Sequence, residues 1–106
     1  MYFAVVKLTF ESQGKTPVDR KDVRSLVEKL RARFKVCASV CEADEEQGTT
    51  SIAVATLGST EERLTQSLDA LSEFCESHGI GRVESEQTLM DHIDAISDFN
   101  SGDDEE

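Results

Sequence analysis

Residues 23–34 read Val-Arg-Ser-Leu-Val-Glu-Lys-Leu-Arg-Ala-Arg-Phe and form the clearest periodic segment of the chain. Apolar side chains recur there every three or four residues, which predicts an amphipathic helix that Asp19 is placed to cap. The apolar stripe consists of Val23, Leu26, Val27, Leu30 and Phe34. Burying these side chains is worth roughly 7–15 kcal/mol before the loss of conformational entropy. A helix with one buried stripe needs a second layer to pack against.

Segments with β-strand composition lie on both sides of this helix and supply that layer. Residues 2–10 are apolar on both faces at their start, as expected of a central strand. Residues 35–42 alternate apolar with small or polar side chains, and residues 49–57 are rich in β-branched and small ones. Residues 82–90 are a more polar fourth strand, which suits the edge of a sheet.

A second helix is predicted after residues 59–62, Ser-Thr-Glu-Glu, which form a capping-box signature. We expect it to stop at Gly79, and its stripe consists of Leu64, Leu68, Leu71, Phe74 and Cys75. The order is therefore β-α-β-β-α-β, and right-handed crossovers place both helices on one face of a four-stranded antiparallel sheet. The sequence predicts an α+β, ferredoxin-like domain over residues 1–92, with the first and third strands central. Residues 93–106 are expected to be an acidic, disordered tail.

One segment is basic within an otherwise acidic chain. The 106 residues carry a formal net charge of −11, yet residues 15–35 hold eight of the eleven basic residues and only three acidic ones. That segment carries +5 and the remainder −16. Nucleic-acid binding over the whole surface is therefore disfavoured, and no DNA partner is expected. The asymmetry marks a candidate interaction surface.

The basic side chains frame the buried stripe of the first helix. Arg20, Arg24 and Arg31 fall along one flank, at spacings of four and seven residues. Guanidinium groups donate paired hydrogen bonds to phosphate oxygens, so a row of arginines suits an anionic partner. The candidates for binding RNA or another anion are Arg20, Lys21, Arg24 and Arg31. The alternative is a solvated face whose long stems cover apolar edges without any partner.

The sheet face that the helices leave open is predicted to be more apolar than a solvated surface should be. Its expected occupants on the first three strands are Phe3, Val5, Cys37, Ser39, Cys41, Ala53, Ala55 and Leu57. The candidates for self-association as a homodimer are Phe3, Val5, Cys37 and Ala55. In the last strand, unbroken alternation would put Val83 and Leu89 on one face.

The three cysteines are expected to be reduced, because their number is odd and no export signal is evident. This predicts a cytoplasmic protein. Cys37 and Cys41 would lie about 13 Å apart along one strand, too far for one zinc ion. Cys75 and His78 could share a metal at i, i+3, but no second pair of ligands accompanies them. No metal or cofactor is therefore expected.

Sequence signals for catalysis and for membranes are missing. There is no P-loop, no Gly-x-Gly-x-x-Gly and no evident nucleophile–base constellation, so we expect no enzyme. His92 is expected to be solvated. No stretch approaches about 18 consecutive apolar residues, so no membrane partner is expected.

The chain resembles the YlxP-like family, the bacterial domain of unknown function 503, over nearly the whole domain. The similarity lies in residues 3–8, most strongly in residues 23–36, and again in residues 52–55 and 64–77. The resemblance implies a ferredoxin-like fold. It also implies an association with translation, since the genes of family members often neighbour those for translation initiation and ribosome maturation factors.

Three positions depart from the family pattern. The usual Ser-Leu-Lys-x-Lys-Arg before the first helix is replaced by residues 15–20, Lys-Thr-Pro-Val-Asp-Arg. Val40 stands where the family has a glutamate in its second strand. Gln47-Gly48 stands where the family has an aromatic residue followed by Gln. If these positions carry the family's function, it is altered in this chain.

The leading prediction is a non-enzymatic binding module that applies its basic helix to an anionic partner, namely the ribosome or its RNA. The runner-up is a self-associating or protein-binding module that uses the open sheet face and touches no nucleic acid. A third reading is a small-molecule regulatory domain, a role that ferredoxin-like folds also fill. No residue pattern in the chain specifies such a ligand.

Overall fold

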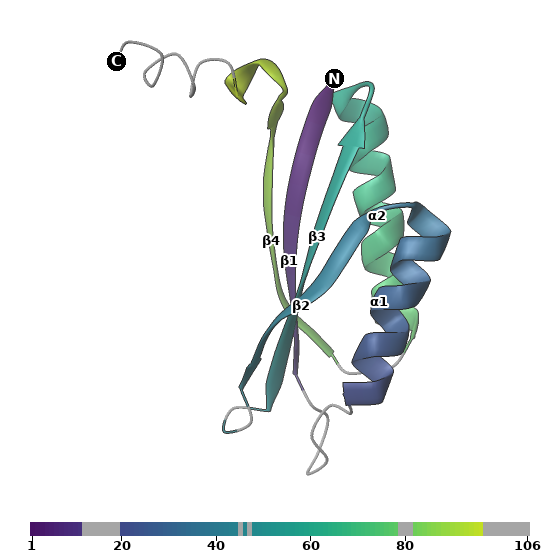
Figure 1. Cartoon of the computed structure of the whole chain (residues 1–106), viewed down its shortest axis with the longest axis vertical. Coiled ribbons are helices and arrows are strands. Elements are labelled where there is room, and N and C mark those ends of the chain that lie inside the picture. The colour runs from purple at the N-terminus through teal and green to yellow at the C-terminus, as the bar shows by residue number, and fades with distance from the viewer. Residues whose placement is uncertain (12–19, 45, 47, 79–81, 97–106) are drawn as a thin grey trace.

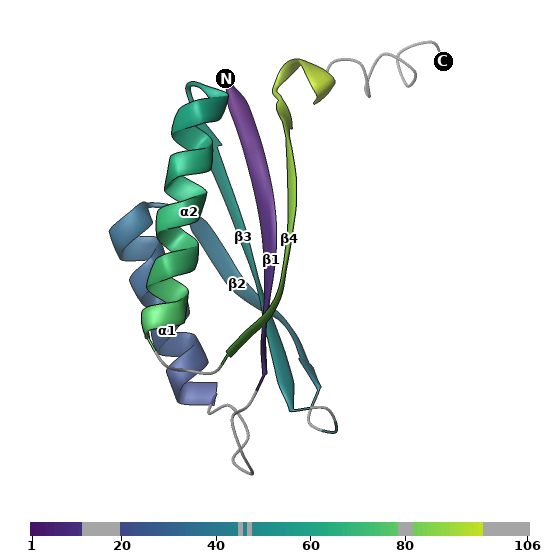
Figure 2. The same cartoon turned by 180° about the vertical axis from the view of Figure 1, so that it is seen from behind.

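The computed structural model describes residues 1–11, 20–44, 46, 48–78 and 82–96. The elements are β1 (Tyr2–Glu11), α1 (Arg20–Phe34), β2 (Cys37–Asp44), β3 (Thr49–Gly58), α2 (Glu61–Ser77) and β4 (Arg82–His92). The four strands form one antiparallel sheet in the order β2-β3-β1-β4. Both helices lie on the same side of it (Figures 1 and 2). The predicted ferredoxin-like α+β fold is confirmed, with β1 and β3 central and β4 at an edge.

The hydrophobic core lies between the helices and one face of the sheet. Every second residue of β1 enters it, and each is at most 1% exposed: Ala4, Val6, Leu8 and Phe10. The helices contribute the predicted stripes, buried at Val23, Leu26, Val27, Leu30, Leu64, Leu68, Leu71 and Cys75. The half-buried rings of Phe34 and Phe74 meet edge to face with centroids 5.5 Å apart. This aromatic contact closes the core between the two helices.

Local backbone features set the ends of the helices. After α1, Lys35 adopts a left-handed conformation with φ of 54°, which breaks the helix before β2. Thr60 caps α2, because its Oγ1 accepts a hydrogen bond at 3.1 Å from the backbone N–H three residues later. The predicted cap Asp19 and the predicted stop Gly79 lie outside the described residues.

A β-bulge changes which face the side chains of β4 occupy. The pairing of β4 with β1 shifts register near the start of β4. Leu89 lies opposite Val5, on the open face. Val83 lies opposite the buried Phe10 instead and packs against the core. The prediction that Val83 and Leu89 share a face is therefore wrong, because one inserted residue reverses the alternation.

A second bulge lies in β2 and brings a charge pair onto the open face. The register with β3 shifts after Val40, so that Glu42 lies opposite Ser51. Glu42 Oε1 then accepts a hydrogen bond at 2.9 Å from Lys7 Nζ on β1. This pair gives one end of the open face a polar character.

The described chain continues for a few residues beyond β4. Ile93 N donates a hydrogen bond at 2.9 Å to the carbonyl oxygen of Met1, and Ile96 N donates to Ile93 O. Ile93 is thus a turn bonded to the start of β1 and residues 94–96 are helical, whereas residues 93–96 were expected to belong to the tail. Residues 97–106 lie outside the described part. No helix in the described residues is long and apolar enough to cross a membrane.

Candidate nucleic-acid interface

A groove of about 480 Å³ lies between α1 and the strands β2 and β3. Its lining residues are Arg20, Val23, Arg24, Val27, Glu28, Arg31, Ser39, Val40, Ala43 and Thr50. The lining combines guanidinium groups from one helix with apolar side chains and small polar ones. A concave site of this composition can hold a ligand that carries both charge and an apolar surface.

Helical geometry explains why three of the predicted arginines line one groove. Arg24 and Arg31 follow Arg20 by four and eleven residues, so the three positions fall within about 40° around the helix axis. Lys21 points to a different sector of α1 and does not line the groove, although it is exposed. The structure therefore brings together three of the four candidate anion-binding residues.

Arg31 also ties the helix to the sheet. Its Nε donates a hydrogen bond at 2.9 Å to the carbonyl oxygen of Ala38 in β2. Within the described residues Arg31 makes no other hydrogen bond or ion pair. The bond fixes the plane of the guanidinium, and the two Nη nitrogens keep their donors for a ligand.

One carboxylate shares the groove with these cations. Glu28 lies on α1 between Arg24 and Arg31 and forms no ion pair with either of them in the described structure. The groove is therefore cationic, and Glu28 offsets part of its positive charge. Glu28 was not included in the site predicted from the sequence. Its spacing of four residues from Arg24 and three from Arg31 places it on the same flank of the helix and could have indicated this.

The opposite flank of α1 has a structural role. The guanidinium carbon of Arg33 lies 5.1 Å from the centroid of the Phe74 ring, a cation–π contact between the two helices. Arg33 therefore belongs to the packing of α1 on α2. The basic helix thus combines one flank that lines a groove with another that contacts α2.

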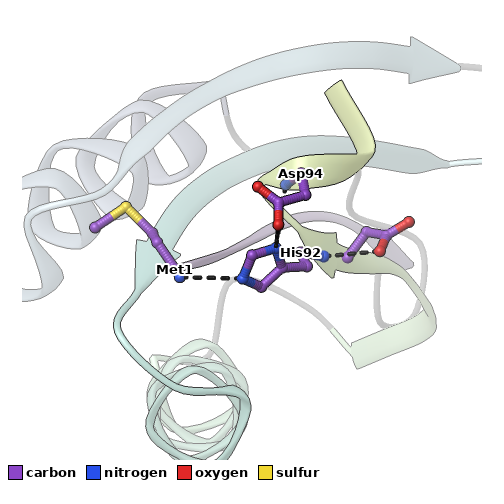
Figure 3. Close-up of polar contacts among 4 residues, drawn as sticks. Met1, His92 and Asp94 are labelled. Atoms are coloured by element: carbon purple, nitrogen blue, oxygen red, sulfur yellow. Dashed lines mark hydrogen bonds and ion pairs between the residues drawn. The ribbon is translucent and has the colours of Figure 1, made fainter. Parts of the chain in front are cut away.

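A separate polar cluster joins the start of β1 to the end of β4, at one end of the sheet (Figure 3). His92 Nε2 lies 3.4 Å from the amino group of Met1, and His92 Nδ1 lies 3.3 Å from Asp94 Oδ2. The ring of Tyr2 meets the imidazole edge-on at 4.9 Å. The backbone N–H of Asp94 also donates a hydrogen bond at 3.1 Å to His92 Nδ1. His92 is therefore half-buried and partnered, in contrast to the expected solvated histidine.

The cysteines fall into two environments. Cys37 and Cys41 are exposed on β2, whereas Cys75 on α2 is fully buried. Burial, helped by the nearby Glu86 and Glu76 carboxylates, raises the pKa of Cys75 to about 12. That thiol stays protonated at neutral pH. Among the described residues, no three His, Cys, Asp or Glu side chains are grouped so that they could hold a metal ion.

The predicted self-association residues lie together on the open face. One row crosses all four strands, with Cys37 opposite Ala55, Ala55 opposite Val5, and Val5 opposite Leu89. Phe3 and Leu57 face each other in the next row. These six residues are called the open-face patch below. Val5 is 43%, Leu57 60% and Leu89 64% exposed, which is high for large apolar side chains.

Comparison with known proteins gives a family and a fold. The family described as "Protein of unknown function (DUF503)" matches residues 19–88. No curated protein matches the chain. The de novo designed protein Foldit4 aligns with a TM-score of 0.50 at 11% identity, covering 86% of this chain and 96% of its own. An Arabidopsis thaliana protein aligns with a TM-score of 0.50 at 16% identity, covering 85% and 93%. At these identities the structural similarity establishes the fold alone.

Proposed function

Since the chain belongs to the DUF503 family of proteins of unknown function, we propose from its own residues that it is a non-enzymatic RNA-binding module. Its partner is ribosomal RNA, which it meets in the cytoplasm. The observation that carries the proposal is the convergence of Arg20, Arg24 and Arg31 on the groove between α1 and β2. The family's implied association with translation supports the choice of RNA.

The chemistry of the groove favours phosphate groups. Guanidinium groups bind phosphate oxygens through paired, charge-assisted hydrogen bonds, and Arg31 is already oriented by its bond to Ala38. An uncharged partner would cover the guanidinium groups of Arg24 and Arg31 without offering them a counter-charge. A phosphodiester backbone offers one charge per nucleotide, which matches a row of cations along a helix.

The apolar part of the groove favours a single-stranded segment. Val40, which is 46% exposed, lies beside the arginines and can contact the face of an unstacked base or a ribose. A duplex keeps its bases stacked inside and would leave this side chain without a partner. The groove volume of about 480 Å³ lies in the range of sites for small ligands, so it accommodates a short stretch of RNA.

The remainder of the molecule restricts how RNA approaches. Outside residues 15–35 the chain carries −16, which repels a polyanion from most other surfaces. Binding should therefore be oriented, weak and confined to the groove. Each phosphate neutralised adds roughly 0.7–0.9 to the slope of log affinity against log salt, so three contacts give a slope of about 2–3.

The test is co-sedimentation of the tagged protein with ribosomes from a lysate at two salt concentrations. The groove variant changes Arg20, Arg24 and Arg31 to Gln. The matched control changes Lys21, Lys29 and Lys35 to Gln, which removes the same charge from the same segment outside the groove lining. The groove variant should bind less and show a flatter salt dependence, whereas the control should retain most of the binding.

Urea unfolding of both variants shows whether each remains folded, because Arg31→Gln also removes the bond to Ala38. Equal co-sedimentation of wild type and the folded groove variant would contradict the proposal. Absence of binding by the wild type at low salt would contradict it as well. Equal losses in the two variants would mean that overall charge, and not the groove, is responsible.

A further inference from the structure

Side chains in two neighbouring rows of the open face are sorted by size from one edge of the sheet to the other. In these rows β2 and β3 present small side chains, namely Cys37, Ser39, Ala53 and Ala55. β1 and β4 present larger ones, namely Val5, Lys7, Gln87 and Leu89. The sorting ends at the rows on either side, where Leu57 faces Phe3 and where Glu42 lies in line with the small Ser51, Thr9 and Ser85. In the two sorted rows the face is thus low on one half and raised on the other.

We propose that this face binds a second copy of the chain about a two-fold axis that runs along the strands, midway between β3 and β1. Such an axis turns the face over and lays its raised half on the low half of the partner. Cys37 then lies opposite the partner's Leu89, and Ala55 lies opposite the partner's Val5. Sheets packed face to face lie about 10 Å apart with interdigitated side chains, which this size sorting allows.

The identity of the occupant follows from symmetry. A two-fold interface uses the same patch on both copies, so the patch must complement itself. The proposed axis keeps each row of side chains against the same row of the partner. The apolar row of Cys37, Ala55, Val5 and Leu89 therefore meets itself, and Gln87 meets the partner's Ser39. A different protein would need no such internal complementarity.

The size of the face predicts how stable the dimer is. Four strands about 4.8 Å apart and about 33 Å long present roughly 600 Å². Interfaces of standard size bury about 800 Å² on each partner. The whole face must therefore take part, including the polar row with Lys7, and the dimer should dissociate on dilution.

The proposed dimer leaves the RNA groove accessible. The groove lies on the helix side of the sheet, whereas the open-face patch lies on the other side (Figures 1 and 2). Two copies would thus expose two grooves on opposite outer surfaces. The dimer does not depend on the proposed function, and each can fail without the other.

The sharpest test uses Cys37 as a native probe. In a Cys41→Ser background, Leu89→Cys places a second thiol on the same row. Within one chain these positions are three strand spacings, or about 14 Å, apart, too far for a disulfide. Oxidation with diamide should therefore yield a covalent dimer on a non-reducing gel. The matched control is Ser85→Cys on the same strand and face, about 13 Å away from position 89.

A second variant covers the case in which Leu89→Cys itself weakens the dimer. Ala55→Arg puts a long charged side chain into the contact and should shift light scattering at high micromolar concentration from dimer to monomer. Ala70→Arg, the same change on the exposed surface of α2, should leave the dimer intact. A monomeric wild type at that concentration would overturn the proposal. So would equal cross-linking through Ser85→Cys and Leu89→Cys, or a dimer that is indifferent to Ala55→Arg.

Discussion

The two sides of the sheet differ in the kind of interaction that they offer. The groove on the helix side depends on charges from a single helix, where Arg20, Arg24 and Arg31 are neighbours through local geometry. The patch on the open side is apolar and takes one or two residues from each of four strands. Charge attraction weakens with salt, whereas apolar contact does not. The two surfaces should therefore respond to solution conditions in opposite ways.

The largest effect should come from breaking the core that both surfaces share. Phe10 on β1 is fully buried in the core between the helices and the sheet. Phe10→Ala should lower the free energy of unfolding by about 3–5 kcal/mol, because it leaves a cavity. Urea unfolding measures this loss. RNA binding and dimer formation should fall together as the folded fraction falls, and a variant that loses only one of them would show that the surfaces are not built on one cooperative unit.

The stability of the protein should depend on pH through the buried thiol of Cys75, on the helix side of the sheet. The pKa of Cys75 is raised from 9.0 to about 12 in the folded protein, so the native state holds that proton more tightly than the unfolded chain. Its contribution to stability is complete below pH 9 and is lost as the pH rises toward 12. The free energy of unfolding should fall more steeply over this range in the wild type than in Cys75→Ala. Parallel curves for the two proteins would contradict the assignment.

Salt should separate the two surfaces most directly. For an RNA slope of about 2–3, raising salt fourfold should weaken binding roughly 15- to 60-fold. The same change should tighten the dimer, because each copy carries a net charge of −11 and screening reduces their repulsion. Ribosome co-sedimentation and analytical ultracentrifugation measure the two effects. A dimer that weakens with salt would be held by charge and not by the open-face patch.

The smallest effect concerns the acid inside the groove. Glu28→Gln removes the carboxylate that shares the groove with the three arginines. Binding to RNA should tighten about two- to fivefold, since a surface charge contact is worth up to about 1 kcal/mol. The control is Glu73→Gln, an exposed acid on α2 outside the groove lining. If both changes tighten binding equally, only the net charge of the molecule matters.

Most of the fold could be predicted from the sequence, because its signals are local. The helical stripes and the polar edge strand follow from spacing within one segment. The capping-box signature at residues 59–62 places the cap at Ser59, one residue before the observed cap Thr60. The arginine row belongs to the same class, since a helix fixes which residues share a flank. Whether the row binds RNA remains a prediction that the salt and groove variants test.

Features that depend on pairing between distant strands could not be predicted in the same way. The bulge in β4 reverses the face of Val83 relative to Leu89, and no residue type in that segment signals it. Leu89 was therefore not placed in the open-face patch from sequence. The contribution of Glu42 to the open face was missed for the same reason, because a second register shift decides it.

The position of β1 at the centre of the sheet has a consequence for how the chain folds. β1 pairs with β4 from Tyr2 opposite His92 to Glu11 opposite Arg82, so residues far apart in the chain must meet. Closing such a long loop is slow relative to forming the helices or the β2–β3 hairpin. Until β4 docks, one edge of β1 is unpaired and carries a run of apolar side chains. During synthesis, that edge is where another chain could insert a strand, so crowded nascent copies risk exchanging β4 before they fold alone.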